Sequence, residues 1–293
     1  MPASDVGLDD ACWQDGSEMP SDRDWAHDPR YDAAALEQFE ERLRRANRAS
    51  RPGYLRVKGG TLLRHGDPAA IPTAIRLLHR ATESDDFIEV PWAHELLGQA
   101  YRKMGDLDAA EHHYRQCMAT ADEHRNGTTK VTKLFLAEVL LQRDEPGDLA
   151  EVEELLSSPD LTQSLLWNSY IFRYYVAQAR LALRQGRDPR EWAALALELA
   201  GDRRPQLPRH PTVGLVDPDP DVIAELRVLV HGDKLPRFLL RWLVDARRAM
   251  PHRALFRSAS GIGRSAAFSG PGRDEAEASD VTPGGPPAAA PDG

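Results

Sequence analysis

Residues 91 to 124 read PWAHELLGQAYRKMGDLDAAEHHYRQCMATADEH, two helical patterns separated by a Gly-Asp turn. Each pattern carries small or apolar residues on one helical face, namely Leu97, Gly98 and Tyr101, then Ala110, Tyr114 and Cys117. The small residues Gly98 and Ala110 allow two helix backbones to approach closely, while the tyrosines fill the space beside them. This stretch therefore predicts an antiparallel pair of packed helices.

The Gly-Asp turn recurs along the chain. Its glycines are Gly66, Gly105, Gly147 and Gly186, the last with Arg187 inserted before the aspartate. Successive glycines lie 39, 42 and 39 residues apart. A fixed period of this length is typical of repeat architectures, in which each unit is one pair of elements. The spacing predicts an array of helix pairs.

The pattern of residues 91 to 124 resembles the tetratricopeptide repeat, a unit of about 34 residues with Leu-Gly, Tyr, a Gly turn, Ala, an aromatic and Ala in that order. Residues 91 to 124 match at six of these positions, with Cys117 in place of the last Ala. Residues 52 to 90, 125 to 160 and 161 to 201 match more loosely. The resemblance implies an all-α fold, an α-solenoid of antiparallel helix pairs, over residues 52 to 201.

The flanking segments complete the expected domain organisation. Residues 31 to 51 have an amphipathic pattern and are expected to cap the front of the array. Residues 202 to 257 predict a C-terminal helical hairpin, with a basic amphipathic second helix, that caps the back. Residues 1 to 30, an acidic leader, and 258 to 293, a Pro-, Gly- and Ala-rich tail, are expected to be disordered because they can bury little apolar surface.

Composition excludes several classes of protein. The formal net charge is −9, which argues against a uniformly basic nucleic-acid binder. No apolar run approaches the length of a membrane span, and the start of the chain lacks the pattern of a secretory signal. Two cysteines, Cys12 and Cys117, cannot form a disulfide framework. We expect a cytoplasmic protein, with a composition similar to that of proteins from GC-rich bacteria.

No motif in the sequence assembles an active site. His94 and Glu95 begin like the zinc motif HExxH, but Gly98 replaces the second histidine. His113 and Cys117 offer two ligands at i, i+4 spacing, which do not close a tetrahedral site. The sequence therefore predicts a protein that is not an enzyme, with no catalytic residue, metal or cofactor, although a helical-bundle site of an unrecognised kind stays an alternative.

By resemblance, the first helix of each tetratricopeptide unit lines a concave face that binds peptides or partner helices. Carrying the pattern over gives these groove candidates: Arg56, Arg64, Trp92, Glu95, Gln99, Arg102, Lys103, Arg173, Arg180 and Arg184. In the third unit the equivalent positions are Leu134, Glu138 and Gln142. A cationic face of this kind suits an acidic peptide or a C-terminal carboxylate. The alternative is an ordinary solvated surface, because 32 of the 37 basic residues are arginine.

A second candidate surface is the segment from Lys234 to Arg257, which has a net charge of +6 and an apolar stripe. It could lie on an anionic membrane, bind a partner or the acidic leader, or dock on the last repeat with its arginines in water. The favoured function is a non-enzymatic scaffold or adaptor that binds a protein or acidic peptide. The alternative is a regulatory module that acts on nucleic-acid or transcription machinery through residues 234 to 257.

Overall fold

The computed structural model describes residues 24–124, 130–145, 147–207, 210 and 214–231. Within these ranges the regular structure is helical, and the sole β pairing is an isolated bridge between Leu207 and His210. The α-helices are α1 (Ala33–Arg45), α2 (Arg51–His65), α3 (Ile71–Thr82), α4 (Glu89–Met104), α5 (Leu107–His124), α6 (Thr132–Arg143), α7 (Asp148–Ser157), α8 (Pro159–Ser164), α9 (Asn168–Arg184), α10 (Arg190–Gly201) and α11 (Pro220–His231). The short 3-10 helices are η2 (Asp24–His27), η3 (Arg48–Ser50) and η4 (Pro68–Ala70). This confirms the prediction of an all-α protein for the described residues.

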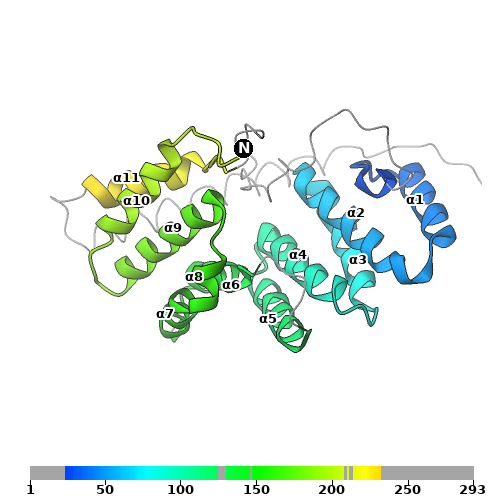
Figure 1. Cartoon of the computed structure of the whole chain (residues 1–293), viewed down its shortest axis with the longest axis horizontal. Coiled ribbons are helices and arrows are strands. Elements are labelled where there is room, and N and C mark those ends of the chain that lie inside the picture. Colours follow the sequence, from blue (N-terminus) through cyan, green and yellow to red (C-terminus); the bar gives the residue numbers. More distant parts are fainter. Residues whose placement is uncertain (1–23, 125–129, 146, 208–209, 211–213, 232–293) are drawn as a thin grey trace, which may run out of the picture. The chain divides into compact units, whose positions relative to one another are not determined.

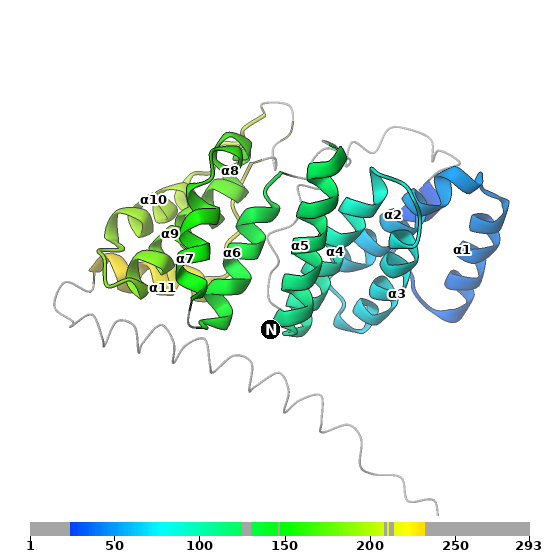
Figure 2. The ribbon, with the colours of Figure 1, turned by 90° about the horizontal axis from the view of Figure 1, so that it is seen from below.

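Helices that follow one another in the chain pack together. Contacts of this kind join α2 to α3, α4 to α5, α6 to α7, and α9 to α10 (Figures 1 and 2). Contacts at least as extensive as those of α6 with α7 also join α3 to α4 and α5 to α6. Each of the first four pairs spans one of the predicted units. In this description α2, α4, α6 and α9 are called the first helices, and α3, α5, α7 and α10 the second helices.

The four turn glycines adopt the left-handed backbone region. Gly66, Gly105, Gly147 and Gly186 have φ values of 76°, 81°, 100° and 69°. Each lies between the first and second helix of a pair, and glycine adopts this conformation without steric cost. Gly66 and Gly105 end α2 and α4, and Gly186 follows the last residues of α9. Gly147 instead precedes α7, because α6 already ends at Asp144. The positive φ angle required at these four turns therefore explains why glycine recurs there.

The aspartate of the Gly-Asp motif starts the next helix. Asp67 Oδ1 accepts a hydrogen bond from the Ala69 amide at 2.9 Å, and Asp106 Oδ1 accepts one from the Ala109 amide at 3.0 Å. A side-chain oxygen in this position satisfies an amide that has no partner within the helix. The motif thus combines a helix stop with a helix start.

Small residues on the first helices let the second helices approach closely. A Cβ atom added to Gly98 of α4 would lie 2.5 Å from the Tyr114 ring of α5. A Cβ atom on Gly59 of α2 would lie 2.7 Å from the side chain of Leu78 of α3. Tyr114 is fully buried, as the predicted helix pair requires.

The apolar side chains form three clusters of buried residues. One joins η2 and α1 to α4, the second joins α5 to α9, and the third joins α9, α10 and α11. Helix α9 belongs to two clusters and α4 packs beside α3 and α5, so neighbouring pairs share core surface rather than standing apart. Among the residues between Thr132 and Leu141 of α6, Lys133 alone is not buried.

The N-terminal segment is attached to α2 by a buried lysine. Lys58 is 1% exposed and donates hydrogen bonds to the backbone carbonyls of Asp28 and Arg30. Burial lowers the pKa of the Lys58 ammonium. Helix α1 begins at Ala33, where the side chain of Asp32 caps the Ala35 amide at 3.0 Å. Its apolar stripe packs into the first cluster, in agreement with the expected helix at residues 31 to 51.

Three details differ from the sequence prediction. The last residues of the leader, which was expected to be disordered up to residue 30, form the 3-10 helix η2, whose Ala26 is buried in the first cluster. The short helix α8 follows α7 and buries Leu161, although no helix was expected there. The first half of the expected C-terminal hairpin is present as α11, while its second half lies outside the described residues. The acidic leader up to residue 23, the basic segment and the C-terminal tail lie outside them as well. In the described part of the chain, no helix has the length and apolar character needed to cross a membrane.

We predict that Gly98→Ala lowers the free energy of unfolding by about 1 to 2 kcal/mol. The added methyl group meets the Tyr114 ring, and this overpacking outweighs the gain of up to about 1 kcal/mol in helix propensity. Urea denaturation monitored by circular dichroism measures the change. The matched control is Gly201→Ala at the end of α10, where nothing lies within 4 Å of the added atom. Equal stability of the two variants would contradict the close-packing role of Gly98.

Candidate functional site

The predicted groove residues begin at the contact between α2 and α4. Arg56 of α2 forms an ion pair with Glu89, the first residue of α4. Its guanidinium also lies over the Trp92 ring, 5.1 Å from the ring centroid. Such stacking on an aromatic face is favoured for arginine. One predicted cation and the predicted tryptophan are therefore brought together, but the cation already has an anionic partner.

The next contact joins α4 to α6. Glu95 is 3% exposed, and its carboxylate accepts a hydrogen bond from the Thr132 hydroxyl at 2.6 Å. The same hydroxyl lies 3.6 Å from the sulfur of the free cysteine Cys117. Arg102 donates from Nη1 to Glu138 Oε2 at 2.6 Å. Glu95 and Arg102 of α4 thus both contact α6, the first helix of the following unit.

Glu138 is the centre of the polar contacts on the first helices. Arg173 of α9 holds it in fork geometry, with Nε to Oε1 at 2.9 Å and Nη2 to Oε2 at 2.5 Å. Burial alone would raise the pKa of Glu138, but attraction to Arg173 and Arg102 outweighs it and lowers the pKa to about 2. The Arg173 guanidinium also lies 4.4 Å from the centroid of the Phe135 ring. A carboxylate on one first helix is therefore shared by arginines from two others.

The remaining predicted arginines of α9 are also paired. Arg180 donates from Nε and Nη2 to the two oxygens of Glu225 on α11, at 2.9 and 2.7 Å. Arg184 forms an ion pair with Asp144 at the end of α6, and its side chain is 6% exposed. These two ion pairs connect α9 to α11 and to the end of α6.

Two further predicted residues donate hydrogen bonds to groups of α2. Lys103 Nζ donates to the Leu63 carbonyl of α2 at 2.8 Å, and Arg64 Nη2 donates to the Thr61 hydroxyl at 3.1 Å. Gln99 lies on α4 between the positions of Glu95 and Arg102, and it is partly exposed. In the third unit Leu134 is fully buried and Glu138 is engaged as above, so Gln142 is the exposed one of the three candidates there.

These contacts link equivalent parts of successive units. The paired residues are separated by 33 positions for Arg56 and Glu89, and by 36 for Arg102 and Glu138. The separation is 35 for Glu138 and Arg173 and 45 for Arg180 and Glu225. Sequence reasoning identified the arginines but missed that carboxylates of neighbouring helices neutralise them, from further along the chain for Arg56, Arg102 and Arg180 and from earlier in the chain for Arg173 and Arg184. An Arg and a Glu about 35 residues apart, at matching positions of successive first helices, is the signal that could have revealed the pairs.

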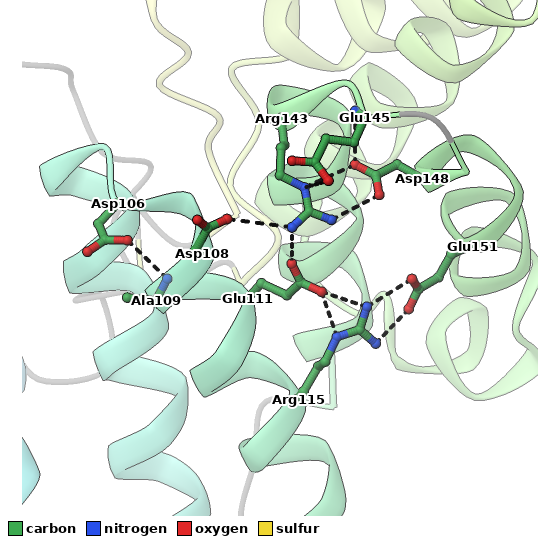
Figure 3. Close-up of polar contacts among 9 residues, drawn as sticks. All are labelled: Asp106, Asp108, Ala109, Glu111, Arg115, Arg143, Glu145, Asp148 and Glu151. Atoms are coloured by element: carbon green, nitrogen blue, oxygen red, sulfur yellow. Dashed lines mark hydrogen bonds and ion pairs between the residues drawn. The ribbon is translucent and has the colours of Figure 1, made fainter.

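A second polar network joins α5, α6 and α7 (Figure 3). Arg115 donates to both oxygens of Glu151 at 2.7 and 2.9 Å and also pairs with Glu111. Arg143 pairs with Glu111 and, at 2.9 Å, with Asp148. Hydrogen bonds to Glu151 and Asp148, respectively, raise the pKa values of the two arginines. This network holds the second unit against the third on the side of their second helices.

Four histidines and a tyrosine converge where α3, α4 and α5 meet. His94 Nδ1 lies 3.1 Å from His113 Nδ1, and His79 Nε2 lies 3.1 Å from the Tyr101 hydroxyl. The ring of His112 lies beside that of His113, with centroids 5.1 Å apart. Sequence analysis considered His94 and His113 separately as metal ligands and did not foresee that they meet.

The chemistry available at these sites is polar binding. Among the described residues, no group of three or more His, Cys, Asp or Glu side chains is arranged to hold a metal ion. Burial raises the pKa of the Cys117 thiol, which disfavours the reactive thiolate. The first-helix contacts can position a partner's polar groups through arginine and glutamine donors.

Comparison with known proteins yields no relative. No protein-family model matches the chain, and neither the curated proteins nor the solved structures contain a match.

We predict that Glu138→Gln lowers the free energy of unfolding by about 3 kcal/mol at pH 7. The substitution leaves Arg102 and Arg173 facing each other without a carboxylate. Because its folded pKa of about 2 lies below the ordinary value of 4.5, Glu138 contributes stability above about pH 4.5, and that contribution is lost as the pH falls toward 2. The variant should therefore lose less stability than the wild type between pH 5 and pH 3.

Glu153→Gln is the control, because Glu153 is half exposed and pairs with the exposed Arg187. It should change the free energy of unfolding by less than about 1 kcal/mol. Urea denaturation over this pH range measures both variants. If the two variants match in stability and in pH dependence, Glu138 does not tie the first helices together.

Proposed function

We propose that this protein is a non-enzymatic scaffold that binds a partner protein through a stack of tetratricopeptide-like helix pairs. In this proposal the pairs α2/α3, α4/α5, α6/α7 and α9/α10 are the repeats, and α1 and α11 cover the two ends of the stack. A stack of this kind offers an extended surface built from its first helices. In this proposal the array is a solenoid, and the protein acts through its extended binding surface rather than through a catalytic cleft.

The observation that carries the proposal is the regular spacing of equivalent features. Turn glycines with positive φ recur 39, 42 and 39 residues apart, each within a helix pair. Gly59 and Gly98 face large second-helix residues in successive units. Ion pairs between first helices join residues 33 to 36 positions apart, a spacing close to that of the glycines. Stacked equivalent units account for all three spacings together.

The first helices are the favoured binding side. Trp92, Gln99 and Arg102 of α4 share one side of that helix and keep part of their surface exposed. Cations outnumber carboxylates among the predicted groove residues and their partners. The ion pairs fix the arginines in place, so binding orders few additional side chains. An acidic peptide segment of a partner protein is the ligand class that fits this side.

The test uses a charge change that breaks no ion pair. We predict that Gln99→Glu weakens binding of a fluorescein-labelled acidic peptide by about tenfold, because it places a negative charge, which repels the peptide, beside Arg102 and Trp92. Gln99→Lys should strengthen binding of the same peptide. The probe is a twelve-residue peptide of alternating Glu and Ala with a free C-terminus, and fluorescence anisotropy measures its affinity.

Gln116→Glu is the matched control, since Gln116 is exposed on the second helix α5. It should leave the affinity unchanged. A peptide with Gln in place of every Glu should bind weakly to all variants. Salt at 0.5 M should weaken binding of the acidic peptide. Equal affinity of the acidic and neutral peptides, or equal effects at positions 99 and 116, would contradict the proposed surface.

A further inference from the structure

The histidine joint is formed by His79, His94, Tyr101, His112 and His113. His79 comes from α3, His94 and Tyr101 come from α4, and His112 and His113 come from α5. These three helices include the whole second unit and the second helix of the first unit. The joint therefore sits where the first helix pair packs on the second.

The rings are in mutual contact. His113 stacks on Tyr101 with centroids 5.3 Å apart and planes 11° from parallel, and it stacks on His94 with centroids 5.3 Å apart. The ring of His79 meets that of His113 edge to face at 5.4 Å. Since the Nδ1 atoms of His94 and His113 are 3.1 Å apart, one of them donates a proton and the other accepts it.

Proton uptake would change this arrangement in two steps. The first proton can enter at the outer nitrogen of the donor ring and keep the Nδ1 hydrogen bond, but it places a positive charge on His94, which is partly buried, or on His113, which is buried. The second proton occupies the accepting Nδ1, so that two N–H groups face each other and the hydrogen bond is lost. Both steps favour separation of the helices, because the separated rings regain water around their charges.

The surroundings of the joint offer no compensating carboxylate among the described residues. The pKa values of His94 and His113 fall to about 4, because burial disfavours the charged rings and the other histidines repel them. The nearest acids in sequence are occupied: Glu95 binds Thr132, and Glu111 pairs with Arg115 and Arg143. On α3, Arg80 pairs with Glu40 of α1. Tyr101, a further titratable neighbour, hydrogen-bonds to His79 through its phenol. The exposed Glu83 follows His79 by four residues, Asp108 precedes His112 by four residues and pairs with Arg143, and Cys117, with a buried thiol, follows His113 by four residues.

We propose that the histidine joint makes the packing of α3, α4 and α5 acid-sensitive, so that proton uptake loosens the contact between the first two helix pairs. The acid sensitivity of the joint is argued from the contacts among its own rings and does not depend on the proposed function. Any effect of acid on partner binding rests on the function proposed above, because α4 carries both the joint and Gln99.

The direction of the pH effect follows from linkage. A histidine whose folded pKa lies below its ordinary value of 6.5 binds more protons when the joint is open. Stability is therefore complete above about pH 6.5 and is lost as the pH falls toward 4. One histidine with a folded pKa of about 4 raises the open fraction about 30-fold at pH 5 relative to pH 7.5.

Hydrogen exchange of the full chain, measured by mass spectrometry at pH 5.0 and pH 7.5 and corrected for intrinsic exchange rates, tests the proposal. Because 30-fold is the contribution of one such histidine and the joint has two, we expect amides of α3, α4 and α5 to lose protection by at least about 30-fold at pH 5.0, and amides of α9 and α10 to lose less. In the double variant His94→Asn/His113→Asn this loss should shrink to a few fold. Asn places a polar atom near the Nδ1 position but does not titrate.

His65→Asn is the matched control, because His65 is exposed at the end of α2. It should keep the full acid response. An independent measurement on the wild type is the NMR titration of the histidine ring protons, in which two of the ten histidines should titrate well below pH 5.5. Titration of every histidine near pH 6.5, or an equal loss of protection in all helices, would overturn the proposal. Neither measurement involves a partner, so failure of peptide binding and failure of the joint are distinguishable.

Discussion

The charge of the Glu138 carboxylate constrains how three of the first helices can pack. Its side chain is 8% exposed, so it must meet cations, and Arg102 and Arg173 supply them from α4 and α9. A buried pair of this kind adds little net stability over apolar packing, but removal of one member is costly. Because the fork of Arg173 fits two oxygens at once, it also fixes the rotation of α9 against α6. Apolar contacts alone would tolerate several such rotations, since they are not directional.

Local features of the fold were predictable because their causes are local. A glycine that ends one helix in the left-handed region and an aspartate that caps the next are adjacent in sequence, so the Gly-Asp motif indicates the turn directly. The approach of Gly98 to Tyr114 was predictable for a similar reason, since both residues belong to one helix pair. The limit of α1 and the presence of α8 were less predictable, because the end of a short helix depends on what it packs against.

The residues of the candidate site could be predicted from the sequence, but the carboxylates that neutralise its arginines could not. Arg56, Arg102 and Arg180 were expected as site residues from the resemblance to the tetratricopeptide pattern. Their carboxylate partners lie 33, 36 and 45 residues further along the chain, and which carboxylate meets which arginine depends on how one unit is rotated on the next. The contact between His94 and His113 lies within one helix pair, as the contact of Gly98 with Tyr114 does, so it depends on the relative rotation of α4 and α5 alone.

Helix α4 connects these features because each of its sides has a different neighbour. Gly98 and His94 contact α5, Glu95 and Arg102 contact α6, and Lys103 reaches α2. A helix that is held on three sides cannot move without changing several of these contacts together. Loss of the imidazole hydrogen bond on the α5 side would therefore alter the position of the arginine that meets Glu138. Proton uptake and the polar contacts of the first helices are coupled through this one helix, by rigid packing rather than by any direct contact between the two groups.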